Sequence, residues 1–192
     1  MTSIRILLSI ACNLDWPLFQ FDVQKAFLQG ELEEDIYMSL PPGHPLEGSG
    51  KLCHLKKAIY SLKQSPRAWY SKLSQALSQA QFSKCKCDHS IFLRKRGSLS
   101  TIVLIYVDDI IITGSDKEGI EKIKFFLKQK FDIKDLGKIK YFLGIEFARS
   151  NKGLPLSQRK FASDILKEFK MLNCNPIDSP VDPNSKLDLC LS

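Results

Sequence analysis

The length and composition of the chain indicate one globular domain. It has 192 residues, of which 44% are hydrophobic and 26% are charged, so it carries enough apolar side chain to bury a core. This composition excludes an intrinsically disordered or collagen-like protein. The longest apolar run, from Ile102 to Ile112, is too short to span a bilayer and contains two aspartates. No membrane partner is therefore expected.

The cysteine pattern is typical of a reduced, intracellular protein. The six cysteines form no CxxC pair and no dense disulfide spacing. No targeting signal is visible, so we expect a cytoplasmic or nuclear location. Cys85, Cys87 and His89 could contribute to a zinc site, but a single cluster without a second pair of ligands favours buried thiols beside a strand.

The net charge of +7 is unevenly distributed along the chain. Residues 1–50 hold 2 basic and 7 acidic side chains, whereas residues 51–100 hold 11 basic and 1 acidic. Tyr60, Trp69 and Tyr70 are interleaved with these positive charges. Such a segment suits a polyanion whose phosphates bind cations and whose bases rest on flat side chains. The alternative is an ordinary solvated surface.

Hydrophobic periodicity, caps and turn residues predict both helices and strands. The expected helices cover residues 2–15, 67–81, 115–130 and 157–171, with Pro66 opening the second helix and a Ser115–Glu118 capping box opening the third. The expected strands cover residues 18–23, 51–56, 91–94, 101–113, 143–147 and 154–156. Because these elements do not alternate regularly, we expect an α+β domain over residues 1–192, in which helices back an antiparallel sheet and residues 172–192 form an irregular tail.

Two adjacent carboxylates, Asp108 and Asp109, interrupt the longest apolar run. Because bare burial would cost them several kcal/mol, they must lie at a turn or bind a cation. A strand–Asp–Asp–strand hairpin satisfies both conditions, since a divalent metal at the sheet edge can offset their repulsion. Asn-Gly or Asp-Gly would make a better simple turn, which favours a functional site over a solvated hairpin tip.

A metal site for phosphoryl transfer needs a further carboxylate, and Asp22 at the end of the first strand is the candidate. Two Mg²⁺ ions about 4 Å apart, or Mn²⁺ in their place, could then activate a 3′-hydroxyl and stabilise a pyrophosphate leaving group. Considered alone, a strand-end aspartate is more often a cap or a surface residue.

Six blocks of sequence follow one another along almost the whole chain. They are FDVQKAFLQGELEEDIYM at 21–38, PPG at 41–43, SLKQSPRAWY at 61–70, YVDD at 106–109, KDLG with YFLGIE between 134 and 146, and LSQ at 156–158. Together, and in this order, they resemble the reverse transcriptase of copia-type LTR retrotransposons. YVDD alone would be weak evidence, whereas the ordered series is specific.

The resemblance implies a right-handed polymerase fold, with a palm and part of the fingers, and RNA-directed DNA polymerase activity on dNTPs and an RNA or DNA template-primer. It makes Asp22, Asp108 and Asp109 the catalytic, metal-binding carboxylates. Five residues are expected to contact substrate: Phe27 as an aromatic gate that leaves no room for a 2′-hydroxyl, Gln64 beside the nucleotide, Lys63 and Arg67 near phosphate, and Tyr106 in YVDD. Trp69 is expected in the helix core.

The sequence also departs from the family pattern. Ser61 stands where the family usually has glycine, which strains the backbone if the position needs a positive φ. Pro155 falls in an expected hairpin strand and is tolerable only at an edge. The chain matches the middle of the family domain, so we expect a fragment of a longer polyprotein whose remainder includes further fingers strands, a thumb and ribonuclease H.

Three alternatives stay open at this point. The first is a non-catalytic relic of a retrotransposon that at most binds nucleic acid through residues 51–96. The second is a palm-like nucleotidyl enzyme, such as a cyclase, that forms product from nucleotide without a template. The third is a structural α+β domain whose aspartates bind nothing.

Overall fold

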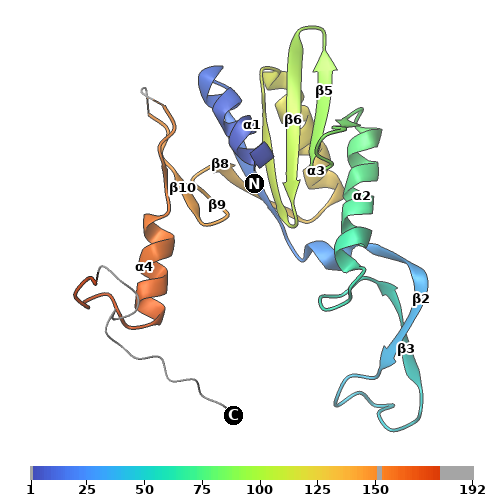
Figure 1. The fold of residues 1–192 in the computed structure, drawn as a ribbon. Coiled ribbons are helices and arrows are strands. Elements are labelled where there is room, and N and C mark those ends of the chain that lie inside the picture. Colours follow the sequence, from blue (N-terminus) through green and yellow to red (C-terminus); the bar gives the residue numbers. More distant parts are fainter. Residues whose placement is uncertain (1, 151–152, 178–192) are drawn as a thin grey trace. The chain divides into compact units, whose positions relative to one another are not determined.

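The computed structural model of the chain describes residues 2–150 and 153–177, and it divides into two compact units (Figure 1). Of the described residues, the first unit takes those up to Ile139 and Gly153, and the second takes residues 140–150 and those from Leu154 onward. Helices and antiparallel strands mix in the described residues, as expected for an α+β fold. No helix in these residues is long and apolar enough to cross a membrane. The expectation of a single domain over residues 1–192 stays a prediction.

The first unit is built around a six-stranded antiparallel sheet in the order β4-β5-β6-β7-β1-β8. Its strands are β1 (Leu18–Val23), β4 (Ser83–Lys84), β5 (Ile91–Arg96), β6 (Leu99–Tyr106), β7 (Asp109–Gly114) and β8 (Ile133–Lys138). A separate two-stranded ribbon pairs β2 (Glu31–Ser39) with β3 (Leu52–Lys57). The helices of the unit are α1 (Thr2–Asn13), the 3-10 turn η1 (Ala26–Gln29), α2 (Ser65–Gln79) and α3 (Lys117–Lys130).

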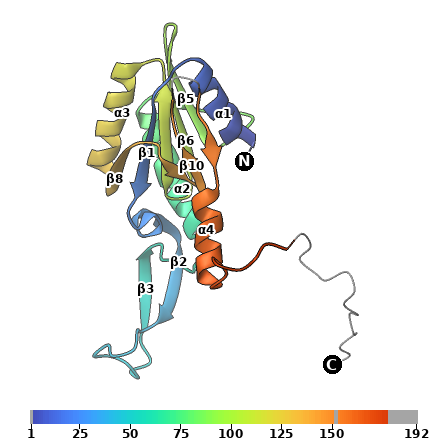
Figure 2. The same ribbon diagram turned by 90° about the vertical axis from the view of Figure 1, so that its left-hand side faces the viewer.

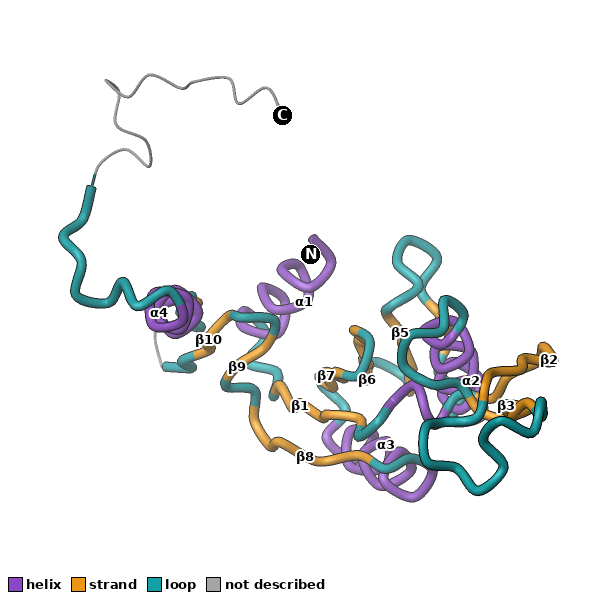
Figure 3. Tube along the Cα trace, turned by 90° about the horizontal axis from the view of Figure 1, so that it is seen from below, coloured by secondary structure: helices purple, strands orange, loops and turns teal. Residues whose placement is uncertain are grey.

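The main hydrophobic core lies between one face of this sheet and two helices. Phe21 of β1 and Ile110 of β7 belong to it, together with side chains from α2 and α3: Trp69, Leu73, Leu77, Ile120, Ile123 and Leu127. Figures 2 and 3 show α1 on the side of the sheet opposite α3. Because side chains alternate along a strand, Gln20, Asp22 and Asp109 point away from the α2–α3 core.

The second unit contains a small three-stranded sheet and one helix. The sheet has the order β11-β10-β9, with β9 at Tyr141–Phe142, β10 at Ile145–Phe147 and β11 at Leu156–Ser157, and helix α4 covers Arg159–Glu168. Pairing of β10 with β11 confirms the expected hairpin. Pro155 immediately precedes β11, which is an edge strand, so the proline removes no donor from a central ladder. Residues 178–192 of the expected tail lie outside the described part.

The structure corrects several predictions. Strands β2 and β8 do not show in the sequence pattern because β2 is mostly exposed and β8 buries none of its residues fully. The expected strand over 101–113 is two strands, β6 and β7, as the hairpin hypothesis requires. Asp116, and not Ser115, caps α3 by accepting a 2.9 Å hydrogen bond from the Gly119 N–H. The expectation of buried thiols is wrong for Cys87, which is exposed.

Candidate active site

The hairpin between β6 and β7 presents the aspartate pair at one end of the six-stranded sheet. Tyr106 and Asp109 form its last cross-strand pair, so Val107 and Asp108 make a two-residue loop. Asp108 is exposed and Asp109 is half-buried. The turn therefore lifts one carboxylate into solvent and keeps the other against the sheet, as the sequence predicted for a hairpin tip.

Asp22 lies directly beside this pair. It is the cross-strand partner of Asp109 in the β1–β7 ladder, and the N–H of Val23, the next residue, donates a 2.8 Å hydrogen bond to the Asp108 carbonyl. Side chains that face each other across antiparallel strands have Cβ atoms about 4.5–5.5 Å apart, and like charges there are destabilising. Asp22, Asp108 and Asp109, which we call the carboxylate end of the sheet, thus gather negative charge at a cost to stability.

Two glutamine side chains hold these carboxylates, and sequence reasoning missed the role of both. Buried Gln20 donates a 3.0 Å hydrogen bond from Nε2 to Oδ1 of Asp109, and Gln24 donates from Nε2 to Oδ2 of Asp22. Burial raises the pKa of Asp109, the hydrogen bond from Gln20 opposes the rise, and the charges of Asp108 and Asp22 add to it. A buried glutamine two residues before Asp22, on the same strand face, is the signal that could have identified the first contact.

The donor set of the carboxylate end suits a hard divalent cation. All three residues offer carboxylate oxygens, and the half-burial of Asp109, which raises its pKa, keeps its charge partly out of water. However, no group of three or more His, Cys, Asp or Glu side chains in the described residues is arranged to hold a metal ion. This holds for the three aspartates and for Cys85, Cys87 and His89. The chemistry of the donors, three carboxylates, fits Mg²⁺.

Phe27 and Tyr106, two of the expected substrate residues, flank the carboxylate end along the chain. Phe27 lies on η1, which follows β1, and its ring packs against Tyr60 with the ring centroids 5.0 Å apart. Phe27 is half-buried and also contacts the core. Tyr106 is exposed at the end of β6. Phe27 is thus partly core and partly accessible.

The other three expected substrate residues lie at the start of α2. Lys63 and Arg67 are exposed, and Gln64 donates a 3.1 Å hydrogen bond from Nε2 to Oε2 of Glu34 on β2. Gln64 and Arg67 line a hollow of about 370 Å³ between β2 and α2, whose other walls are Glu31, Leu32, Glu33, Glu34, Ala68, Ser71, Lys72 and Gln75. The hollow includes none of the three aspartates. The acidic stretch 31–35 thus borders the basic helix, a contact that the sequence did not reveal.

A close backbone contact places η1 beside α2. A Cβ atom on Gly30 would lie 2.9 Å from the backbone nitrogen of Trp69, closer than real Cβ contacts allow, so glycine permits this approach. Trp69 is 2% exposed, which confirms its predicted place in the core. Its indole Nε1–H also donates a 2.7 Å hydrogen bond to the Val107 carbonyl of the YVDD turn. The sequence did not predict this link between α2 and the aspartate turn.

Three non-glycine residues near the site have left-handed backbone angles, and one of them is Lys25 before η1, with φ +51°. Val107 has φ +57° and Ser61, in the segment before α2, has φ +81°. Ser61 therefore meets the condition under which a residue other than glycine at this position strains the backbone. Side chains other than glycine rarely adopt this region, and a β-branched residue such as Val107 does so least readily.

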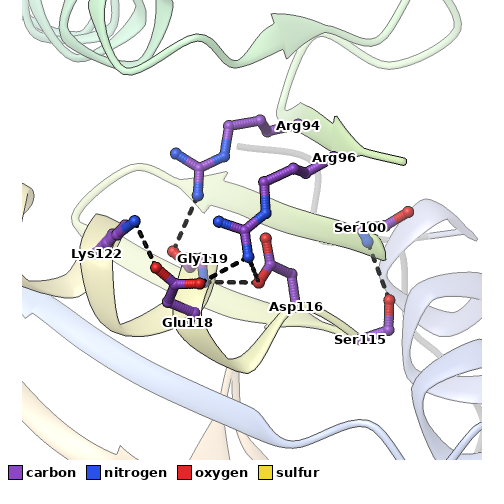
Figure 4. Close-up of polar contacts among 8 residues, drawn as sticks. All are labelled: Arg94, Arg96, Ser100, Ser115, Asp116, Glu118, Gly119 and Lys122. Atoms are coloured by element: carbon purple, nitrogen blue, oxygen red, sulfur yellow. Dashed lines mark hydrogen bonds and ion pairs between the residues drawn. The ribbon is translucent and has the colours of Figure 1, made fainter. Parts of the chain in front are cut away.

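The opposite end of the sheet carries charges that are paired (Figure 4). Arg96 at the end of β5 contacts Glu118 at 2.7 Å and Asp116 at 3.5 Å, and Lys122 contacts Glu118 at 2.6 Å. Arg94 donates a 3.2 Å hydrogen bond to the Gly119 carbonyl. We call Arg96, Asp116, Glu118 and Lys122 the paired end. Its charges neutralise one another and cap α3, so it has a structural role.

Comparison with known proteins identifies the family. A family model described as reverse transcriptase (RNA-dependent DNA polymerase) matches residues 1–183. The chain is 44% identical, over 98% of its length, to the retrovirus-related Pol polyprotein from transposon RE1 of Arabidopsis thaliana. It is 40% identical, over 97% of its length, to the corresponding polyprotein from transposon TNT 1-94 of Nicotiana tabacum. It is 30% identical, over 94% of its length, to the transposon Ty1-NL2 Gag-Pol polyprotein of Saccharomyces cerevisiae.

The chain spans only 13%, 14% and 11% of the lengths of these three polyproteins. The relatives are Pol polyproteins of copia-type transposons, and the matched segment is the one that the six sequence blocks predicted. The chain therefore belongs to the reverse transcriptase (RNA-dependent DNA polymerase) family, as a copia-type retrotransposon member.

Proposed function

We propose that this chain is the palm-centred part of an RNA-directed DNA polymerase that adds dNTPs to a template-primer. One observation carries the proposal: Asp22, Asp108 and Asp109 meet at one end of a single antiparallel sheet, with Asp22 and Asp109 paired across neighbouring strands. Three like charges placed together reduce stability. Such an arrangement is typical of a site that binds cations, and the family membership supplies the reaction class.

The three aspartates would hold Mg²⁺, or Mn²⁺ in its place, at this end. When bound, the metal would activate the primer 3′-hydroxyl and stabilise the pyrophosphate leaving group. The chain's own residues orient the ligands: Gln20 holds Asp109 and Gln24 holds Asp22. Because phosphoryl transfer depends mainly on positioning, these two amides contribute by restricting carboxylate rotation.

The substrate residues would act from three places: η1, the start of α2 and the end of β6. Phe27 on η1 would exclude the 2′-hydroxyl of a ribonucleotide, since its ring would occupy the space below the incoming sugar. Lys63 and Arg67 would bind phosphate through their exposed charges, while Gln64 would exchange its contact with Glu34 for one with the nucleotide. Tyr106, exposed beside the turn, would complete the nucleotide contacts.

The remainder of a polyprotein would supply the parts that hold the duplex and degrade the RNA strand. The curated relatives are far longer than this chain, so the thumb, the further fingers strands and the ribonuclease H activity belong to this proposal as partners. We place the reaction inside the cell, in the cytoplasm or nucleus, where dNTPs and an RNA template are present.

A second candidate is a non-catalytic relic that binds nucleic acid. The observation that favours it is the exposure of Lys63 and Arg67 in the basic segment 51–100, because phosphate binding by exposed cations does not require the aspartates. Such binding would weaken as salt rises, with a log–log slope of about −0.9 for each phosphate neutralised on B-DNA.

A template-dependent incorporation assay with Mg²⁺ and dNTPs tests the proposal. It is run with this chain and with a version lengthened by its neighbouring polyprotein sequence, with and without template, beside a salt titration of binding. Template-dependent extension supports the polymerase, whereas salt-sensitive binding without extension in either version identifies a relic. Product formed from nucleotide alone identifies a cyclase-like enzyme. If neither product nor binding is observed, the chain is a structural domain.

A further inference from the structure

The turn that carries Asp108 and Asp109 is strained at its first residue. Only Val107 and Asp108 connect β6 to β7, and Val107 is left-handed, with φ +57°. Its branched side chain makes this backbone angle unfavourable, so the turn keeps it only where other contacts hold it in place. Those contacts also determine where the two carboxylates lie.

Two hydrogen bonds hold the peptide groups on either side of Asp108. The indole Nε1–H of Trp69 donates to the Val107 carbonyl at 2.7 Å and fixes the preceding peptide. The Val23 N–H donates to the Asp108 carbonyl at 2.8 Å and fixes the following one. The first bond connects the turn to α2 and the second connects it to the strand that carries Asp22. With both peptides fixed, the direction of the Asp108 side chain is restricted.

Trp69 is a rigid donor. Its side chain is 2% exposed and packs edge-on against Phe131, with centroids 5.3 Å apart and ring planes at 83°. Its backbone is pressed against Gly30, where even a methyl group would not fit. The indole therefore cannot move independently of α2, and the carbonyl it binds is located relative to that helix.

We propose that Trp69 is a positioning residue for the aspartate turn. Its indole N–H holds the Val107 carbonyl and sets where Asp108 and Asp109 lie relative to α2, the helix at whose start Lys63, Gln64 and Arg67 lie. The competing explanation is that Trp69 only fills the core, for which any aromatic ring of similar size would serve. The catalytic consequence rests on the proposed function, whereas the structural role does not.

Local hydrogen exchange separates the two explanations in the full chain, without requiring activity. We expect Trp69→Phe to speed amide exchange at residues 106–109 by about two- to tenfold beyond any change in β5 and in the rest of β6, because one hydrogen bond is lost. The matched control is Leu73→Ala, on the same helix and 0% exposed in the same core. This control should speed exchange throughout the core without singling out the turn.

A second replacement removes the donor without creating a cavity. Site-specific incorporation of β-(3-benzothienyl)alanine at position 69 replaces the indole N–H by sulfur and keeps the size of the ring. It should loosen residues 106–109 as Trp69→Phe does, with little change in the exchange of β5. If exchange at residues 106–109 is unchanged with this analogue, or follows the rest of the sheet in both variants, Trp69 is core packing and the proposal is overturned.

Enzyme kinetics test whether the Trp69–Val107 hydrogen bond matters for the reaction. In a version that incorporates dNTPs, Trp69→Phe should lower kcat by about ten- to a hundredfold and change the dNTP KM far less, because the carboxylates are displaced while the proposed nucleotide contacts on η1 and at the start of α2 remain. Leu73→Ala should retain kcat per folded molecule. Loosening of residues 106–109 with unchanged kcat would overturn the positioning role. If residues 106–109 exchange faster but no version of the chain incorporates dNTPs, the proposed function is contradicted. The structural role of the Trp69–Val107 hydrogen bond would then still hold.

Discussion

The two ends of the six-stranded sheet differ in how their charged side chains are arranged: one end pairs opposite charges and the other gathers like charges. At the paired end, Asp116 accepts a backbone hydrogen bond and contacts Arg96, and Glu118 contacts two cations. At the carboxylate end, about 17 Å away along β7, Asp22 and Asp109 face each other across two strands. The paired end is arranged as a stable fold requires. The carboxylate end gathers like charges, which is expected to cost stability, as the proposed metal-binding site would require.

The largest effect on stability is expected at the paired end. Asp116 is 2% exposed and caps α3, so Asp116→Ala should lower the free energy of unfolding by about 1–2 kcal/mol because the Gly119 N–H loses its acceptor. Chemical denaturation measures the change. Asp116→Asn is the control, since its side-chain oxygen can still accept the bond, and it should lose much less. Equal losses in both variants would mean that the ion pair with Arg96, and not the cap, matters at this position.

Relief of backbone strain should raise stability at the carboxylate end. Left-handed angles cost about 1–2 kcal/mol for ordinary residues, and glycine adds about 0.5–1 kcal/mol of chain entropy. Val107→Gly should therefore raise the free energy of unfolding by about 0.5–1 kcal/mol, as should Ser61→Gly in the segment before α2. Only Val107→Gly should change dNTP incorporation, because only it alters the aspartate turn. A loss of stability in both variants would show that neither φ is strained.

These elements show what sequence reasoning can and cannot find. The apolar run broken by Asp108 and Asp109 predicted the hairpin. One continuous buried strand would have buried two bare carboxylates, which costs too much free energy. The pairing of β1 with β7 could not be predicted, since the partners are separated by roughly ninety positions and nothing local sets their register. For the same reason the Gln20–Asp109 and Trp69–Val107 hydrogen bonds were out of reach. Strand β8 lacks an apolar pattern and forms through its pairing with β1.

The pH dependence of stability should differ in sign between the two ends. Burial raises the pKa of Asp109 above its ordinary 3.8. A raised pKa favours the folded chain below about pH 3.8, and this contribution is lost as pH rises through the folded value. Asp109→Asn should therefore raise the free energy of unfolding at pH 7, and its advantage should vanish near pH 3. An Asn variant that is less stable at pH 7 would contradict this reading of the site.

The contribution of Glu118 to the free energy of unfolding should depend on pH in the opposite direction and be smaller. A hydrogen bond from Arg96, and then one from Lys122, lower its pKa to about 2. A lowered pKa contributes stability above its ordinary value of 4.5, and this contribution is lost as pH falls through about 2. Glu118→Gln should thus be slightly less stable than the parent at pH 7, with the difference shrinking in acid. Because the group is exposed, high salt should reduce the difference as well.

We propose that the carboxylate end performs Mg²⁺-dependent nucleotide addition, whereas the paired end supports the fold. The direct measurement compares Asp108→Asn with Asp116→Ala in one template-dependent incorporation assay, on a version that is active with the parent sequence. Asp108→Asn should lose incorporation by about a hundredfold or more and keep or gain stability, because a ligand is lost and repulsion is relieved. Asp116→Ala should lose stability and keep its activity per folded molecule. Retained incorporation by Asp108→Asn would show that Asp108 is not a catalytic metal ligand.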